Sequence, residues 1–245
     1  MLSLELDGAL IGVAVRGEGP REEFARALAP WRTDRVANHN YSVWFSNDRR
    51  RFHRLQWGGC VVVRTRDPER FGRGLALHLG GHGVPSRGLV RTDGVVAIHD
   101  GRATVIPSSI RQSMHRFERP LREGGVVLHD APWVDVNPYT GEVFVDPPRL
   151  APARFDAIVK ELPRPPRPDP VVDPGAYPLA AWYFPSLRAE RLMSKAEAVA
   201  TVLTRARWPL SADDQLPALG ALFEQTPFGR MPLRTAGELL DQVRR

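Results

Sequence analysis

The segment VIPSSIRQSMHRFERPL, from Val105 to Leu121, contains residues whose types and spacing could serve phosphate chemistry. An apolar strand is predicted to run into a short polar loop and then into a helix. Nucleotide-binding proteins place a glycine-rich phosphate cradle at such a junction. This loop contains neither glycine nor lysine. It is therefore either a phosphate site of another kind or the remnant of one.

Residues 1–85, which precede this segment, predict a small α+β unit. Strand-like runs alternate with two helices, one beginning at Pro20 and the other capped by Asp67. Glycines at 80 and 81 are expected to end the second helix. The segment HGVPSRG then predicts a linker to the rest of the chain.

Residues 86–245 predict an α/β core with a helical C-terminal part. Two alternating runs meet at Asp100-Gly101, a strong hairpin signal, and a buried strand is expected to end at Asp130. A second hairpin surrounds NPYTG, and a proline-rich excursion lies near 162–175. The run PLAAWYF predicts a further strand, and three helices are expected to close the chain. Two of them begin with capping boxes, at Ser194 and at Thr235.

The order of these elements resembles the HPr kinase/phosphorylase-like family. The resemblance rests on the strand, loop and helix around Val105–Leu121, the strand ending in aspartate, the NPYTG turn and the ending TPFGRMPLRTAGELLDQV. The N-terminal run HRLQWGGCVVVRTRDPERFGRGLALHL is similar to the unit before the kinase core in shorter homologues found beside peptide-modification genes. The resemblance implies a P-loop-type core.

The phosphate loop of that family has the pattern G-x-x-x-x-G-K-[ST], and the matching window here is SSIRQSMH. Ser108 and Ser113 stand where the glycines belong, Met114 replaces the lysine and His115 replaces the hydroxyl residue. Methionine offers no hydrogen-bond donor to a phosphate, and histidine offers nitrogen to a Mg²⁺ ion that prefers oxygen. We therefore expect weak or absent MgATP binding and no cofactor.

The family also has a paired acidic motif at the end of the next strand, and here only Asp130 remains because Ala131 follows it. Pro120 is expected early in the helix after the loop, where it would shorten or kink it. These changes predict a non-catalytic pseudokinase that binds a peptide or a partner enzyme of a peptide-modification or natural-product pathway. The chain is expected to be cytoplasmic, because it has no predicted membrane span or signal peptide.

The alternative is an enzyme that reuses the old pocket for group-transfer or acid-base chemistry. Its candidate groups are His115, His129 and Asp130, which could also form a metal cluster, with Arg111 and Arg116 as an anion clamp. Solvated arginines and unrelated surface or core histidines are the favoured interpretation. The two hypotheses differ in whether replacing His129 or Asp130 abolishes a turnover.

The chain has 34 basic and 28 acidic residues and a net charge of +6. A basic run with aromatic neighbours, Asn47 to Arg54, could track a phosphate backbone. A solvated hairpin turn is the favoured interpretation of this run, so nucleic acid is an unlikely partner. The single cysteine, Cys60, lies in an apolar run and is expected to be buried and inert.

Overall fold

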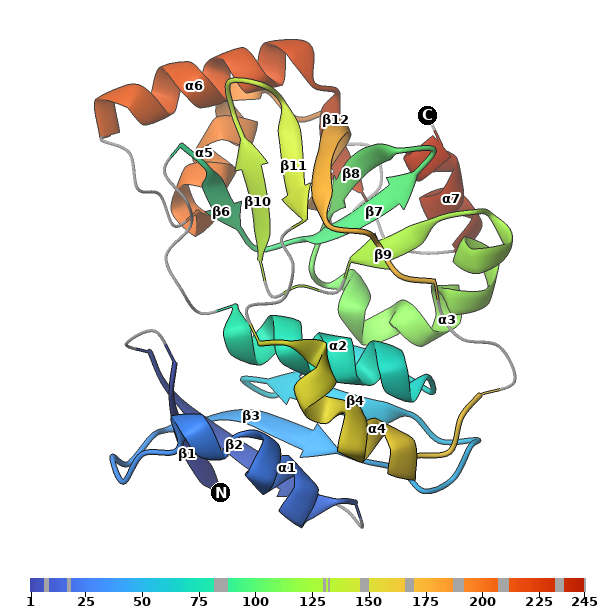
Figure 1. Cartoon of the computed structure of the whole chain (residues 1–245). Helices are drawn as coiled ribbons and strands as arrows, with labels where there is room; N and C mark the ends of the chain where they lie inside the picture. Colours follow the sequence, from blue (N-terminus) through green and yellow to red (C-terminus); the bar gives the residue numbers. More distant parts are fainter. Residues whose placement is uncertain are drawn as a thin grey trace. The chain divides into compact units, whose positions relative to one another are not determined.

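The computed structural model describes most of the chain: residues 1–6, 9–16, 19–81, 88–129, 131, 133–145, 150–165, 170–186, 192–206, 212–231 and 236–244. For residues 39, 112–116, 118, 212, 213, 236 and 237 it describes the backbone only. The chain divides into two compact units, coloured along the sequence in Figure 1. The first unit comprises Met1–Gly83 and Pro147–Asp169, and the second comprises Val84–Asp146 and Pro170–Arg245.

The first unit is built on a mixed sheet of five strands in sequential order. They are β1 (Leu2–Leu6), β2 (Ala9–Arg16), β3 (His39–Trp44), β4 (His53–Trp57) and β5 (Cys60–Thr65). Strands β2 and β3 pair in parallel, and the other neighbours pair antiparallel. The β4–β5 turn is made by Gly58 and Gly59, both with positive φ, as a two-residue hairpin turn requires.

Helices α1 (Arg21–Ala27), α2 (Pro68–Gly80) and α4 (Asp156–Glu161) supply the rest of the core, with short 3₁₀ turns η1 (Ala29–Trp31) and η2 (Pro152–Phe155). Phe24 of α1 packs on Phe45 and Phe155, with ring centroids 5.8 and 6.2 Å away. Asp67 caps α2 as predicted, because its Oδ1 accepts a 3.0 Å hydrogen bond from the Glu69 N–H.

The segment containing η2 and α4 packs in the first unit, although the sequence analysis placed it within residues 86–245. Its apolar residues Phe155, Ile158 and Leu162 are buried in the same core as Tyr41 and Leu75. Helix α4 approaches α2 closely at Gly72, where a Cβ atom would lie only 2.9 Å from the Val159 side chain. Burial of this apolar face explains why the segment returns to the first unit.

His53 is a buried histidine whose burial lowers its pKa from 6.5 to about 4. Its Nδ1 accepts a 3.2 Å hydrogen bond from the Ser46 N–H, which requires the unprotonated nitrogen. Because the folded pKa lies below the unfolded one, this group stabilises the fold above pH 6.5 and loses that contribution as the pH falls toward 4. We expect a loss of about 2 kcal/mol between pH 6.5 and about pH 5.

Denaturation of the wild type and of His53→Asn near those two pH values measures this effect. The asparagine keeps an acceptor for Ser46 but does not titrate in this range. An NMR titration that placed the pKa of His53 near 6.5 would contradict the prediction.

The second unit contains a mixed eight-stranded sheet. Its strands are β6 (Val90–Thr92), β7 (Val95–His99), β8 (Arg102–Ile106), β9 (Val127–His129), β10 (Val134–Asn137), β11 (Glu142–Val145), β12 (Gly175–Pro185) and β13 (Phe228–Met231). The order is β6-β10-β11-β12-β8-β7-β9, with β13 also beside β12. Strand β12 pairs in parallel with β8 and with β13. The predicted β7–β8 hairpin is confirmed, with positive φ at Asp100 and Gly101.

Four longer helices cover both faces of this sheet: α3 (Ile110–Glu123), α5 (Lys195–Arg205), α6 (Ala212–Gln225) and α7 (Ala236–Arg244). Alternate residues of β7 enter different cores, Val96 with α5 and α6, and Val95 with α3 and α7. Figure 1 shows each helix pair together on its own side of the sheet. The capping box at Ser194 is confirmed, whereas Thr235 lies outside the described residues.

Within the described part of the chain, no helix is long and apolar enough to cross a membrane. The prediction for Cys60 is wrong, because this thiol is exposed at the start of β5. Cys60 is the first residue of β5, and the three valines that follow it made the whole run read as buried in the sequence. The predicted NPYTG hairpin is confirmed as β10 and β11.

Candidate functional site

The junction between β8 and α3 is the segment that the sequence singled out as a phosphate site. Strand β8 ends at Ile106 and α3 begins at Ile110, so only Pro107, Ser108 and Ser109 lie between them. The Ile110 N–H donates to the Pro107 carbonyl at 3.1 Å, and the Arg111 N–H donates to the Ser108 carbonyl at 3.0 Å. Two amides at the start of the helix are thus already occupied by the turn.

The residues expected in the loop are divided between this turn and the helix. Ser108 lies in the turn, whereas Arg111, Ser113, Met114, His115 and Arg116 all belong to α3. The run from Ile110 to His115 contains no glycine or proline, so nothing in it prevents the helix from starting early. Pro120 consequently falls in the last turn of α3 and not early in the helix as expected.

Arg111 is the structural centre of the junction. One of its terminal amino groups donates to the Gly94 and Ala131 carbonyls, both at 2.6 Å, and the other lies 3.4 Å from Asp93 Oδ1. Its side chain is only 5% exposed. The expectation of a solvated arginine is wrong for Arg111, because its guanidinium joins α3 to the β6–β7 turn and to Ala131, two residues after β9.

Ser108 belongs to the same network. Its hydroxyl donates to Asp93 Oδ2 at 2.5 Å, while Arg111 contacts the other oxygen of that carboxylate. Asp93 therefore serves as an anion inside the junction and has two partners there. A phosphate at this position would meet a carboxylate of the same charge, which opposes its binding.

The described side chains do not show the proposed acid-base groups next to one another. His129 ends β9 and is buried opposite Val96 of β7. His115 is placed only by its backbone in α3, as are Ser113, Met114 and Arg116, and Asp130 lies outside the described residues. Among the described residues, no three His, Cys, Asp or Glu side chains form a group that could hold a metal ion. The cluster of His115, His129 and Asp130 stays a prediction.

The cavity beside this junction is small. It lies at the carboxyl ends of the parallel strands β8 and β12, next to Ile106, Ser108, Phe184 and Arg205. Its volume is about 20 Å³, which is room for about one water molecule. Ligand sites for drug-sized molecules and cofactors occupy roughly 300–1,000 Å³.

A buried ion pair stands at the end of the same sheet. Arg91 of β6 and Asp135 of β10 are directly opposite each other in the ladder. The Arg91 Nε donates to Asp135 Oδ1 at 2.7 Å, and its Nη2 donates to Oδ2 at 2.6 Å. Both side chains are less than one-tenth exposed, so this bidentate pair has little contact with solvent.

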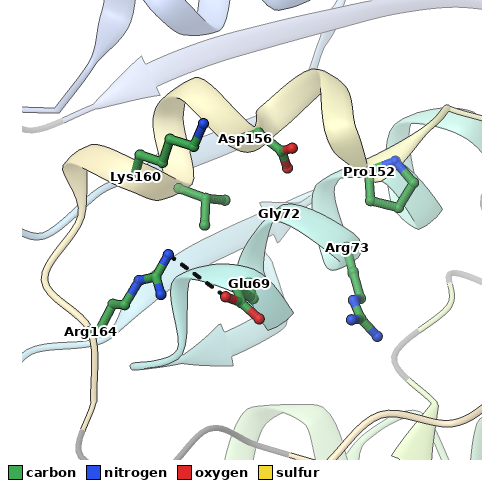
Figure 2. Close-up of a pocket in the computed structure, with 8 residues that line it drawn as sticks. Glu69, Gly72, Arg73, Pro152, Asp156, Lys160 and Arg164 are labelled. Atoms are coloured by element: carbon green, nitrogen blue, oxygen red, sulfur yellow. Dashed lines mark ion pairs between the residues drawn. The ribbon is translucent and has the colours of Figure 1, made fainter.

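A larger cavity, of about 260 Å³, lies in the first unit between α2 and α4. Figure 2 shows Glu69 and Arg164 facing each other across it, with the Arg164 Nη2 3.9 Å from Glu69 Oε1. Its charged lining residues are Glu69, Asp156, Arg73, Lys160 and Arg164. Sequence reasoning missed it, because residues from two distant segments meet there only after folding.

This cavity is lined by charges of both signs, with one more cation than carboxylates. Two carboxylates stand against three cations, and Glu69, Asp156 and Lys160 are exposed to solvent. Figure 2 shows Lys160 directed away from Glu69, so the charges do not converge on one point. Exposed pairs of this kind bind weakly and are screened by salt.

The fold and these sites define a mixed α/β protein with a five-stranded and an eight-stranded sheet. Comparison with models of protein families, with curated proteins and with solved structures finds no match in any of the three.

Proposed function

We propose that this chain is a non-catalytic HPr kinase-like pseudokinase that acts as a peptide- or protein-binding subunit. The strand, turn and helix at β8–α3, beside the parallel strand β12, support a P-loop-type core. The helices on both faces of the sheet agree with such a core. The partner would come from a peptide-modification or natural-product pathway, as the resemblance implies.

The closed β8–α3 turn is the observation on which this proposal rests. A phosphate cradle needs backbone N–H groups that point into open space. Here the N–H groups of Ile110 and Arg111 donate to the turn, and the adjacent cavity holds about one water. The guanidinium of Arg111, which could have replaced the missing lysine, is occupied by protein carbonyls.

The missing side chains add to this effect. Met114 and His115 replace the lysine and the hydroxyl residue that hold the phosphates and Mg²⁺ in active relatives. Charge-assisted contacts contribute about 1.5–3 kcal/mol each, so the two losses together weaken MgATP binding by about a thousandfold or more. A chain that has the element order of such a core without the nucleotide-binding side chains is suited to binding a peptide or a protein.

Calorimetric titration with ATP and with ADP, with and without Mg²⁺, tests the proposal. We expect no heat and no thermal stabilisation at millimolar nucleotide. The matched variant is Ser113→Gly combined with Met114→Lys, which restores one glycine and the lysine and should bind nucleotide more tightly than the wild type. Micromolar binding of MgATP by the wild type would overturn the proposal and favour an enzyme.

A further inference from the structure

Four side chains form a row across the first sheet. Arg16 of β2 is opposite Trp44 of β3, Trp44 is opposite Arg54 of β4, and Arg54 is opposite Arg64 of β5. Residues directly opposite one another share a face of the sheet. With strands about 4.8 Å apart, the row spans about 14 Å. Three arginines and one tryptophan are thus aligned on one surface.

Phe52 extends the row at one end. The guanidinium carbons of Arg64 and Arg66 each lie 4.4 Å from the centre of its ring. Stacking of this kind restrains both cations before any ligand arrives. Together Arg16, Trp44, Phe52, Arg54, Arg64 and Arg66 make up what we call the arginine row.

The arginine row faces away from the helices of its own unit. Helices α1, α2 and α4 pack on the other face of the sheet, with Tyr41, Val43 and Leu55. Arg16, Arg54 and Arg66 are exposed, and Trp44 and Arg64 are half-buried. Ala37 contacts the sheet at some distance from the row. Its N–H donates to the Ser3 hydroxyl, and Ser3 is opposite Gly12, four residues along β2 from Arg16.

Among the described residues of this face, arginines outnumber carboxylates. The next row along the same face consists of Ala14, Ser42 and Gln56, which are uncharged. Two nearby carboxylates have arginine partners outside the row: Glu5 pairs with Arg35 at 3.1 Å, and Asp48 lies 3.6 Å from Arg51. The cations of Arg49 and Arg50 in the adjoining turn add to the same field.

The placement of Arg54 directly opposite Arg64 is unfavourable for the free protein. Like charges at opposite positions of a ladder repel each other and destabilise the sheet. Local conflicts of this sort are expected where function, and not stability, selects the residue. An anionic partner would relieve the repulsion.

We propose that the arginine row binds single-stranded nucleic acid, with the arginines on phosphates and Trp44 stacked on a base. A sheet face that combines exposed cations with an aromatic ring, here Arg16, Arg54 and Arg66 beside the half-buried Trp44, is a platform on which proteins bind single strands. A peptide would instead be expected at a sheet edge, where its backbone can hydrogen-bond to a strand. This surface is independent of the function proposed for the second unit.

Fluorescence anisotropy with a labelled single-stranded oligonucleotide tests the proposal on the full chain. Four phosphate contacts on a single strand predict a fall in affinity of about fifty-fold between 50 and 200 mM salt. Arg54→Ala combined with Arg64→Ala should weaken binding about tenfold or more and lower the salt slope by about 1.4. Trp44→Ala should also weaken it, and Trp44→Phe should keep most of the affinity.

Arg119→Ala is the matched control, because it removes the same charge from an exposed side chain on α3. It should leave binding unchanged, and thermal denaturation should show every variant folded at the temperature of the binding assay. No binding at low salt, or binding unaffected by the paired arginine variant, would overturn the proposal. Equal or tighter binding of a polyglutamate of matched charge would also overturn it, in favour of an acidic peptide.

Discussion

Asp135→Ala is expected to lower the free energy of unfolding of the second unit by about 3–5 kcal/mol. The substitution leaves the Arg91 guanidinium buried without the carboxylate that accepts its two short hydrogen bonds. An unpaired buried charge costs more than the pair contributes, since the pair has already lost its hydration. Chemical denaturation, followed by hydrogen exchange of the β6 and β10 amides, measures the loss.

The double variant Arg91→Met with Asp135→Leu separates the pair from its two members. Replacing both charges by apolar groups of similar volume removes the unpaired charge, so most of the lost stability should return. Glu123→Ala is the control, because its pair with Arg119 is exposed and should contribute less than about 1 kcal/mol. A loss for Asp135→Ala no larger than for Glu123→Ala would contradict the prediction.

Arg111→Leu is expected to destabilise the second unit by about 3 kcal/mol. It removes two short hydrogen bonds from a charged donor and leaves the carbonyls of Gly94 and Ala131 without that donor. The elements that these carbonyls belong to, the β6–β7 turn and the chain after β9, should then exchange their amide protons faster. Denaturation with hydrogen exchange at these amides is the measurement.

Arg102→Ala provides the comparison for Arg111, because this arginine is exposed at the start of β8. Its removal should change stability by less than about 0.5 kcal/mol. If Arg111 were instead an anion ligand, Arg111→Leu would leave stability near the wild-type value and abolish sulfate or phosphate binding. That outcome would identify the β8–α3 junction as a phosphate-binding site.

Elements with local signals were predictable from the sequence. The β7–β8 hairpin follows from Asp100-Gly101, because two successive residues with positive φ are needed there. Helix α2 follows from its Asp67 cap, and α5 from the capping box of Ser194 and Glu197. In each case the signal involves residues a few positions apart, so no distant contact is required.

For the candidate site, the sequence predicted the order of strand, turn and helix but not the contacts within the turn. The strand before Ser108 and the helix after it were expected, but the early start of α3 at Ile110 was not. The segment from Pro107 to His115 contains no glycine that would favour an open loop, and its helix propensity lets α3 start early. The burial of Arg111 depends on Gly94 and Ala131, which are 17 and 20 residues away in the chain.

By itself the sequence determined the β7–β8 and β10–β11 hairpins, the helix caps at Asp67 and Ser194, and the departure of the loop around Ser108 from a phosphate-binding pattern, because these depend on neighbouring residues. Only the tertiary structure decided that α4 packs in the first unit and that Arg91 pairs with Asp135. It alone also aligned Arg16, Trp44 and Arg54 on one face of the first sheet. Strand register and apolar burial bring together residues far apart in the chain, and no short pattern specifies such contacts.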